Sequence, residues 1–455
     1  MERINSKEEF VCFIKSVIAL VLPMAIQNLI NVGVQAADVI MLGKVGEIAI
    51  SASSLAGQVY FIMTLIFFGL TSGAAVLTAQ YWGKRDIGTI EKILAIAIKT
   101  AIIVSVLFTV CSLSIPDYLM RIFSNDTEVI KYGARYLRIV AIAYIPAGFT
   151  MVYLNTIRSI EKVIISTVVY SISLIVNVVL NAILIFGLFG FPAMGINGAA
   201  VATAISRYVE FIIVFVYALK FNDVLKIRIK HLLHTDKILI KDFAKFALPV
   251  TMNELAWGGG ISAINAIIGH LGSSAVAANS VVGVVRQLVM VVTFGVANAT
   301  AIMLGKKIGE GKELTAKLYA KRFIILTLIL GVMGSFIILI LTPVIPSFMS
   351  LGEEAEKYLV QMMLVMAYFV IASGFNTVAI VGVFRAGGDT KIGLVLDCAT
   401  LWGVAVLFGF IAAFIIKLPV IYVYLILTSD EITKIAFVIK RYKSYKWLQN
   451  VTREF

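Results

Sequence analysis

The chain has 455 residues, of which 60% are apolar and only 14% are charged, and its mean hydropathy is +0.98. Soluble domains carry about a quarter charged residues, so this composition excludes an ordinary soluble protein. The net charge is +13, but nucleic-acid binding needs basic residues gathered on one soluble face. Here they lie in short breaks between apolar runs, and we expect no nucleic-acid partner.

The cysteines and histidines point to no redox or metal chemistry. Cys12, Cys111 and Cys398 are scattered through apolar stretches, and the histidines show no metal-ligand spacing. No nucleophile–base pair lies within the apolar runs. We therefore expect no cofactor, no resident metal and no enzymatic activity.

Apolar runs long enough for a membrane-spanning helix, ~18–20 residues, recur along the whole chain. In the first half they predict helices at 14–42, 51–80, 93–115, 131–157, 163–187 and 196–219. In the second half they predict helices at 246–270, 276–304, 323–345, 357–384, 392–416 and 419–438. The expected fold class is an all-α membrane protein with twelve transmembrane helices. We expect an N-terminal six-helix bundle (1–219), a cytoplasmic linker (220–242) and a C-terminal six-helix bundle with a short cytoplasmic tail (243–455).

The two halves repeat each other at a shift of 226 residues. Leu22-Pro23 recurs as Leu248-Pro249, Gly83 as Gly309, and Gly148-Phe149 as Gly374-Phe375. Six spans return the chain to its starting side of the membrane. We therefore expect two bundles related by a pseudo-two-fold axis along the membrane normal, as in many transporters.

Basic residues gather in the segments that lie on one side of these spans, above all 220–241 and 306–322. Lys and Arg concentrate in cytoplasmic loops. This asymmetry predicts a multi-pass protein of the plasma (inner) membrane with both termini in the cytoplasm.

Several local patterns suggest a family. Pro23 and Pro249 lie near the starts of spans 1 and 7, and span 5 carries Asn177 and Asn181 before Gly187. The outer turn 191–203 follows, with the sequence FPAMGINGAAVAT. Together with two six-helix repeats, these features resemble the multidrug and toxic compound extrusion (MATE) family. The resemblance covers nearly the whole chain and implies a V-shaped pair of bundles that exports organic cations in exchange for sodium ions or protons.

One carboxylate in the first half lies within an apolar span, where a charge costs about 2.5–3.5 kcal/mol on insertion scales. It belongs to a polar stripe on one face of span 1, formed by Gln27, Asn31, Gln35 and Asp38. Residues on spans 5 and 6 lie at a similar depth, namely Asn177, Asn181 and Thr203.

Such oxygen donors suit a hard monovalent cation, and a buried acid can instead hold a proton. We expect sodium or a proton at Asp38, Asn177, Asn181 and Thr203. The alternative is a structural cluster of interhelical hydrogen bonds. The MATE resemblance implies the same place, because these positions match the N-terminal cation site of characterised members. Some relatives carry a second acid where this chain has Asn181.

The second half offers candidate substrate-contacting residues. Glu254 on span 7 and Asp397 on span 11 are expected at similar depth, and Trp257 lies one turn from Glu254, where it could offer a cation–π surface. Snorkelling of either acid to the cytoplasmic interface is the alternative. Arg286 on span 8 needs an acid, and we hypothesise pairing with Glu254 or Asp397.

Two further charges in the first half, Arg207 and Glu210, are spaced i, i+3 on span 6. This spacing favours an intrahelical ion pair. Gln27, Asn31 and Gln35 are expected to face a cavity together with the second-half residues.

The sequence therefore predicts a monomeric secondary antiporter that exports amphipathic organic cations by alternating access. Membrane lipid and the transported cations are its expected partners. The alternative is a flippase of lipid-linked saccharides, which would have the same repeat design but would need a strongly cationic cavity.

Overall fold

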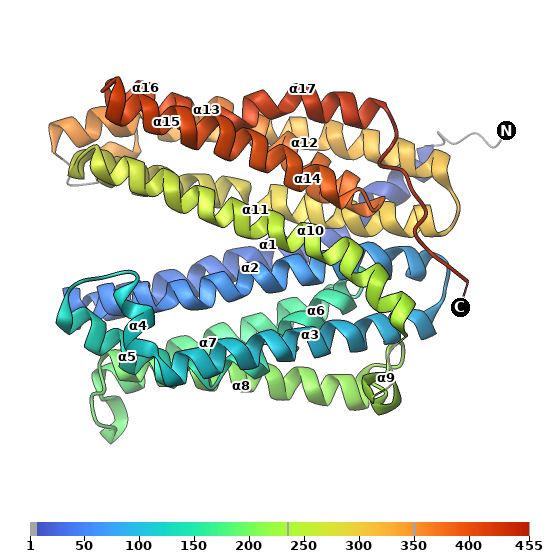
Figure 1. Cartoon of the computed structure of the whole chain (residues 1–455), viewed down its shortest axis with the longest axis horizontal. Coiled ribbons are helices and arrows are strands. Elements are labelled where there is room, and N and C mark those ends of the chain that lie inside the picture. The colour runs from blue at the N-terminus through green and yellow to red at the C-terminus, as the bar shows by residue number, and fades with distance from the viewer. Residues whose placement is uncertain (1–6, 234–235, 349–351, 455) are drawn as a thin grey trace. The chain divides into compact units, whose positions relative to one another are not determined.

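The computed structural model describes residues 7–233, 236–348 and 352–454, and every regular element in these ranges is a helix (Figure 1). This confirms the all-α fold class. Residues 234 and 235 of the expected linker lie outside the described residues, as do 1–6, 349–351 and 455.

The helices of the first repeat closely follow the predicted spans. In chain order they are α1 (Lys7–Gly43), α2 (Glu47–Gly83), α3 (Ile87–Ser114), α4 (Pro116–Arg121), α5 (Thr127–Ala141), α6 (Tyr144–Ser159), α7 (Ile164–Phe186), the 3-10 helix η1 (Leu188–Gly190), α8 (Ile196–Val216), the π-helix η2 (Tyr217–Phe221) and α9 (Ile229–Leu233).

The second repeat adds several π-helical segments. Its helices are α10 (Lys237–His270), α11 (Ser273–Gly309), α12 (Glu313–Leu341), the 3-10 helix η3 (Ile345–Phe348), α13 (Glu353–Thr377), the π-helix η4 (Val378–Phe384), α14 (Thr390–Asp397), the π-helix η5 (Cys398–Val406), α15 (Leu407–Phe410), the π-helix η6 (Ile411–Ile415), α16 (Val420–Leu427) and α17 (Asp430–Lys443).

The internal repeat extends to the helix boundaries. Helices α2 and α11 both have 37 residues, and α11 begins and ends 226 positions after α2. Helix α14 begins at the same offset from α7. The duplicated sequence thus folds into duplicated helices.

Within the described ranges, nine helices are long and apolar enough to cross a membrane, and a tenth span forms if α5 and α6, bent by 55°, count as one. Helix α10 and the α16–α17 pair occupy the two remaining predicted spans. Within the described ranges, the helices therefore account for all twelve predicted spans. Large apolar side chains such as Ile103 (69% exposed) and Ile340 (66%) stand on the outer faces, as expected of surfaces that meet lipid.

The segment predicted as span 12 is not one continuous helix in the structure. Helix α16 ends at Leu427 and α17 starts at Asp430. The intervening Thr428 and Ser429 bond back to carbonyls of the preceding turn, and two acids follow in the first turn of α17. These polar residues, 428–431, interrupt the segment that hydropathy alone predicts to be a single helix.

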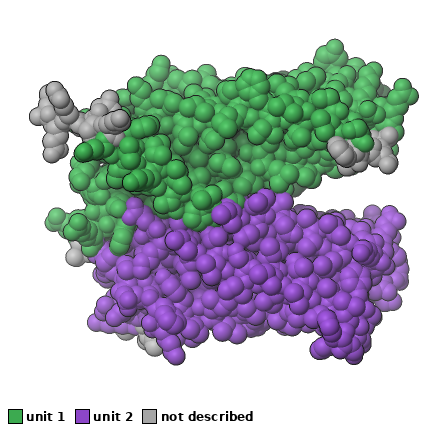
Figure 2. All heavy atoms as spheres, turned by 180° about the vertical axis from the view of Figure 1, so that it is seen from behind, with its two compact units in different colours: residues 1–25, 75–85, 248–455 green, residues 26–74, 86–247 purple. Residues whose placement is uncertain are grey.

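The chain forms two compact units, coloured separately in Figure 2. Unit 1 comprises residues 1–25, 75–85 and 248–455, and unit 2 comprises residues 26–74 and 86–247. Helices α1 and α2 each run from one unit into the other. The division into bundles at residues 219 and 243 stays a prediction.

Candidate functional site

Within unit 2, the predicted polar cluster comes together around Asn181 of α7. Its amide nitrogen donates to Asp38 Oδ1 of α1 at 2.5 Å and to Asn177 Oδ1 at 3.0 Å. Asn177 and Asn181 are one helical turn apart, so both side chains lie on the same face of α7. Both asparagines are buried, whereas Asp38 is partly exposed.

Two oxygens of this cluster are buried with unused hydrogen-bonding capacity. Among the described residues, Asn181 Oδ1 has no hydrogen-bond partner, and Thr203 Oγ1 of α8 makes no hydrogen bond of standard geometry. Tyr136 of α5 lies beside Thr203 and close enough to Asp38 to feel its charge. A buried oxygen without a partner loses its hydration with no compensation. This donor set fits a small cation that would supply the missing interaction.

Tyr136 was not predicted as a site residue. A tyrosine within an amphipathic helix gives no signal that distinguishes a site residue from a packing residue. Only the fold places its hydroxyl beside residues from α1, α7 and α8.

The residues of the polar stripe on α1 differ in burial and in hydrogen-bond partners. Gln27 is buried, and its Oε1 accepts from Arg158 Nη2 at 3.1 Å. Asn31 and Gln35 are exposed. The structure thus places the Arg158 guanidinium against the α1 stripe. Its Nε is buried and has no hydrogen-bond partner in the part of the chain that the structure describes.

The intrahelical pair on α8 is confirmed. Arg207 Nη1 lies 2.7 Å from Glu210 Oε1, and the guanidinium lies over the Tyr60 ring, 5.7 Å from its centroid. Glu210 therefore supplies the carboxylate that Arg207 needs. Across the described part of the chain, Asp38 has no basic side chain within ion-pair distance.

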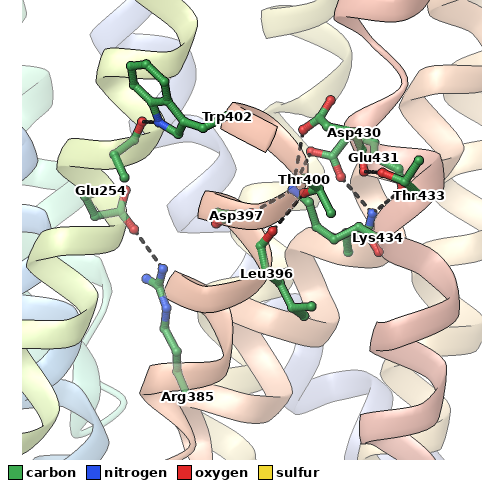
Figure 3. A network of polar contacts seen from close by, with 12 residues as sticks. Glu254, Arg385, Leu396, Asp397, Thr400, Trp402, Asp430, Glu431, Thr433 and Lys434 are labelled. Atoms are coloured by element: carbon green, nitrogen blue, oxygen red, sulfur yellow. Dashed lines mark hydrogen bonds and ion pairs between the residues drawn. The ribbon is translucent and has the colours of Figure 1, made fainter. Parts of the chain in front are cut away.

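Unit 1 contains a second charged network, drawn in Figure 3. Arg385 Nη2, just after η4, lies 2.8 Å from Glu254 Oε1 of α10. Lys434 Nζ of α17 lies 2.7 Å from Asp397 Oδ1 of α14, and at 3.5 and 3.6 Å it meets two acids of its own helix, Asp430 and Glu431. Arg385 and Lys434 are both buried.

The network also has an amide neighbour. Asn376 of α13 donates from Nδ2 to Glu431 Oε2 at 2.7 Å, while its Oδ1 is buried and has no hydrogen-bond partner within the described ranges. Asp397 lies near enough to Glu254 for their charges to interact. Glu254 and Asp397 thus share a region, as predicted, but each already holds a basic side chain.

The hypothesised pairing of Arg286 is therefore corrected. Among the described residues, Arg385 and Lys434 take Glu254 and Asp397, and Arg286 lies near Tyr424 of α16 instead. Both acids end in ion pairs with buried basic groups.

Two tryptophans flank the Glu254 end of this network. Trp257 is 39% exposed. Trp402 of η5 donates from Nε1 to the carbonyl of Ala256 at 2.9 Å (Figure 3). Trp402 was not predicted, since nothing in its sequence context separates it from a lipid-facing residue.

The comparisons with known proteins agree with this architecture. The MatE family model matches residues 23–183 and 259–411. The chain is similar to the probable multidrug resistance protein YoeA of Bacillus subtilis, 24% identical over 413 residues that cover 90% of this chain and 89% of that protein. It is also similar to a probable multidrug resistance protein, NorM, of Thermotoga maritima, 24% identical over 455 residues that cover 98% and 96%.

The fold matches that of a MOP superfamily transporter from Pyrococcus furiosus, with a TM-score of 0.85, 20% identity and coverage of 95% of this chain and 96% of that one. The family match spans both repeats and most of the chain, and it does not favour the flippase alternative. The chain is a multi-pass membrane protein and belongs to the MatE family, the multidrug and toxic compound extrusion transporters.

Proposed function

We propose that this chain is a monomeric secondary antiporter of the plasma membrane that exports amphipathic organic cations in exchange for sodium ions or protons. Family membership supports drug efflux, and two similar proteins are named as probable multidrug resistance proteins. The distribution of basic residues supports cytoplasmic termini.

The single observation that carries the proposal is the state of Asp38. Its partner is an amide, Asn181, and no basic side chain within ion-pair distance neutralises it in the described ranges. Asn181 Oδ1 and Thr203 Oγ1, neither of which makes a hydrogen bond of standard geometry among the described residues, lie in the same cluster. A monovalent cation at this point would neutralise the carboxylate and satisfy those oxygens together.

Competition at Asp38 supplies the coupling. Two monovalent cations ~4 Å apart repel by ~4 kcal/mol at an effective dielectric constant of 20, which is about a thousandfold in affinity. The coupling ion and the organic cation therefore exclude each other. By linkage, each reduces the affinity for the other to the same extent, and alternating access turns this exclusion into exchange.

The remaining predicted residues are assigned to substrate contacts within their own units. In unit 1, Trp257 is exposed one turn from Glu254 and suits a cation–π contact. Asp397 and Arg286 belong to the same unit. In unit 2, Asn31 and Gln35 are exposed on the helix that carries Asp38.

The test uses purified protein in liposomes loaded with a fluorescent organic cation, with sodium and proton gradients imposed separately. We expect one gradient to drive export and Asp38→Asn to abolish the coupling. The matched control is Asp117→Asn, the same substitution at an exposed acid of α4 that pairs with Arg138 at 3.3 Å. Ion-coupled export that persists in Asp38→Asn, at control protein levels, would contradict the proposal.

A further inference from the structure

Gln80 forms a junction near the C-terminal end of α2. Its side chain is fully buried. Its Nε2 donates to the carbonyls of Ala386 and Gln449 at 2.8 and 3.1 Å, and its Oε1 accepts from Val451 N at 2.8 Å. One side chain thus connects α2, the turn before α14 and the C-terminal segment, all within unit 1.

The C-terminal segment, residues 447–453, is called the strap here. Beyond Gln80 it makes further contacts with α2, since Arg453 N donates to the Tyr81 hydroxyl and Lys84 Nζ donates to the Arg453 carbonyl, both at 3.0 Å. Asn450 Nδ2 reaches the carbonyl of Ile308 on α11 at 3.4 Å. The strap therefore ties the end of α2 to the second repeat.

The two ends of the strap differ in burial. Trp447 is fully buried, and its Nε1 donates to the Tyr442 carbonyl at 3.1 Å. Gly387 lies so close to the Trp447 carbonyl that a Cβ would collide with it. Residues 449, 450 and 453 are exposed and have no regular secondary structure. Trp447 is an anchor, and the part beyond it is held chiefly by hydrogen bonds to α2.

Beneath the strap, α2 and α11 pack backbone to backbone. A Cβ at Gly83 would strike the carbonyl of Lys306, and a Cβ at Gly309 would strike that of Gln80. Gly83 and Gly309 are repeat counterparts, as are positions 80 and 306, so the contact is symmetric. The strap contacts both helices at this packing, through the Gln80 side chain on α2 and through the Ile308 carbonyl on α11.

Helix α2 is continuous across the boundary between the two units. Residues 75–85 belong to unit 1, whereas the rest of the same continuous helix, residues 47–74, belongs to unit 2. Any rearrangement that moves the end of α2 away from α11 must break the bonds to Gln80, Tyr81 and Lys84.

We propose that the strap is a releasable latch on the cytoplasmic end of α2, and that residues 448–453 must detach from Gln80 before the transporter opens toward the cytoplasm. This inference rests on the alternating-access function proposed above. Each lost hydrogen bond is worth about fivefold in an equilibrium, so removing the Gln80 side chain favours the unlatched state by tenfold or more.

The first test measures the latch without transport. In Gln80→Met, we expect the backbone amides of residues 449–453 to exchange hydrogen about tenfold faster than in the unmodified protein. Gln449→Met is the matched control, because Gln449 binds Gln80 through its backbone carbonyl and its side chain bonds only locally, to the Lys446 carbonyl. Equal exchange in Gln80→Met and Gln449→Met would overturn the latch.

The second test fixes the latch closed. Cysteines replace Lys84 and Arg453 in a background without Cys12, Cys111 and Cys398, and a reducible bifunctional thiol reagent joins them. We expect export to fall at least tenfold and to recover on reduction. A pair at Ser274 and Glu354, whose side chains meet at 3.0 Å away from the strap, serves as the control and retains export.

Undiminished export with the strap joined to α2 would overturn the proposal. If the unmodified protein exports no organic cation under either gradient, the proposed substrate fails instead. The exchange measurement still decides the latch in that case, because it needs no substrate.

Discussion

Arg158 and Arg385 occupy equivalent places in the two repeats. Each stands three residues before a turn residue with a positive φ, Glu161 at 68° and Gly388 at 80°. Each donates to the long first helix of its own repeat, but Arg158 meets an amide at 3.1 Å and Arg385 a carboxylate at 2.8 Å. The offset between them is one residue longer than the general repeat, because the π-helix η4 inserts a residue just before Arg385.

This difference in partner predicts different sensitivities to substitution. Glu254→Gln gives Arg385 the neutral partner that Arg158 already has, so a hydrogen bond can remain while the charge of Arg385 loses its carboxylate. We expect unfolding in detergent to become easier by about 1–3 kcal/mol, less than the 3–5 kcal/mol that follows when a buried ion-pair partner is removed outright.

Glu254→Ala gives that larger loss and serves as the comparison in the same denaturant series. An unchanged unfolding midpoint in both variants would show that the Arg385 pair contributes nothing to stability.

The oxygen cluster at Asp38 gives a second prediction, which rests on the proposed cation site. Thr203→Val keeps the shape of the side chain but removes the hydroxyl. We expect the concentration of coupling ion that gives half-maximal export to rise about tenfold, the equivalent of one ion–oxygen contact of ~1.4 kcal/mol. Thr203→Ser restores the hydroxyl and should restore the ion dependence. A Thr203→Val protein with unaltered ion dependence would remove this residue from the site.

The sequence predicted much of the architecture, because hydropathy and the repeat report directly on membrane-embedded helices. It also predicted that Asp38, Asn177 and Asn181 would meet, since helical spacing and depth fix their faces. The ion-pair partners in the second repeat were not predicted. Arg385 lies beside a glycine-containing turn and Lys434 lies near the end of predicted span 12, so neither stands out from the basic residues that flank the spans.

Two other features lay beyond what the sequence could show. A π-helix such as η4 changes the register by one residue without altering hydropathy. The role of Gln80 depends on contacts to backbone carbonyls near residues 386 and 449, more than 300 positions away. Such contacts involve no side-chain pattern that a single sequence records.

A third prediction concerns pH and lies outside the spans, at Glu310. Burial raises the pKa of this carboxyl, but hydrogen bonds from Lys307 and Lys312 and their positive charges outweigh it, so the pKa lies below its usual range. The resulting stabilisation is complete above the pKa of an unfolded glutamate, about 4.3, and is lost as the pH falls through the lower folded value.

We therefore expect Glu310→Gln to lower the melting temperature slightly at pH 7 and to have no effect once the pH falls well below 4.3. Melting temperatures of both proteins across this range provide the measurement. A difference that grows on acidification would contradict the assignment.

The last prediction tests whether Lys434 holds its three acids together. Lys434→Met removes the ammonium but keeps most of the aliphatic volume, which leaves Asp397, Asp430 and Glu431 close together and buried without their common partner. Removing one side of a buried ion pair costs about 3–5 kcal/mol, so we expect a loss of stability of that size in denaturant unfolding.

Adding Asp397→Asn to Lys434→Met removes the acid with the shortest contact, 2.7 Å, and should recover part of the loss. If the double variant is as unstable as the sum of both single variants, the acids do not interact through Lys434, and the network of Figure 3 is a set of independent contacts.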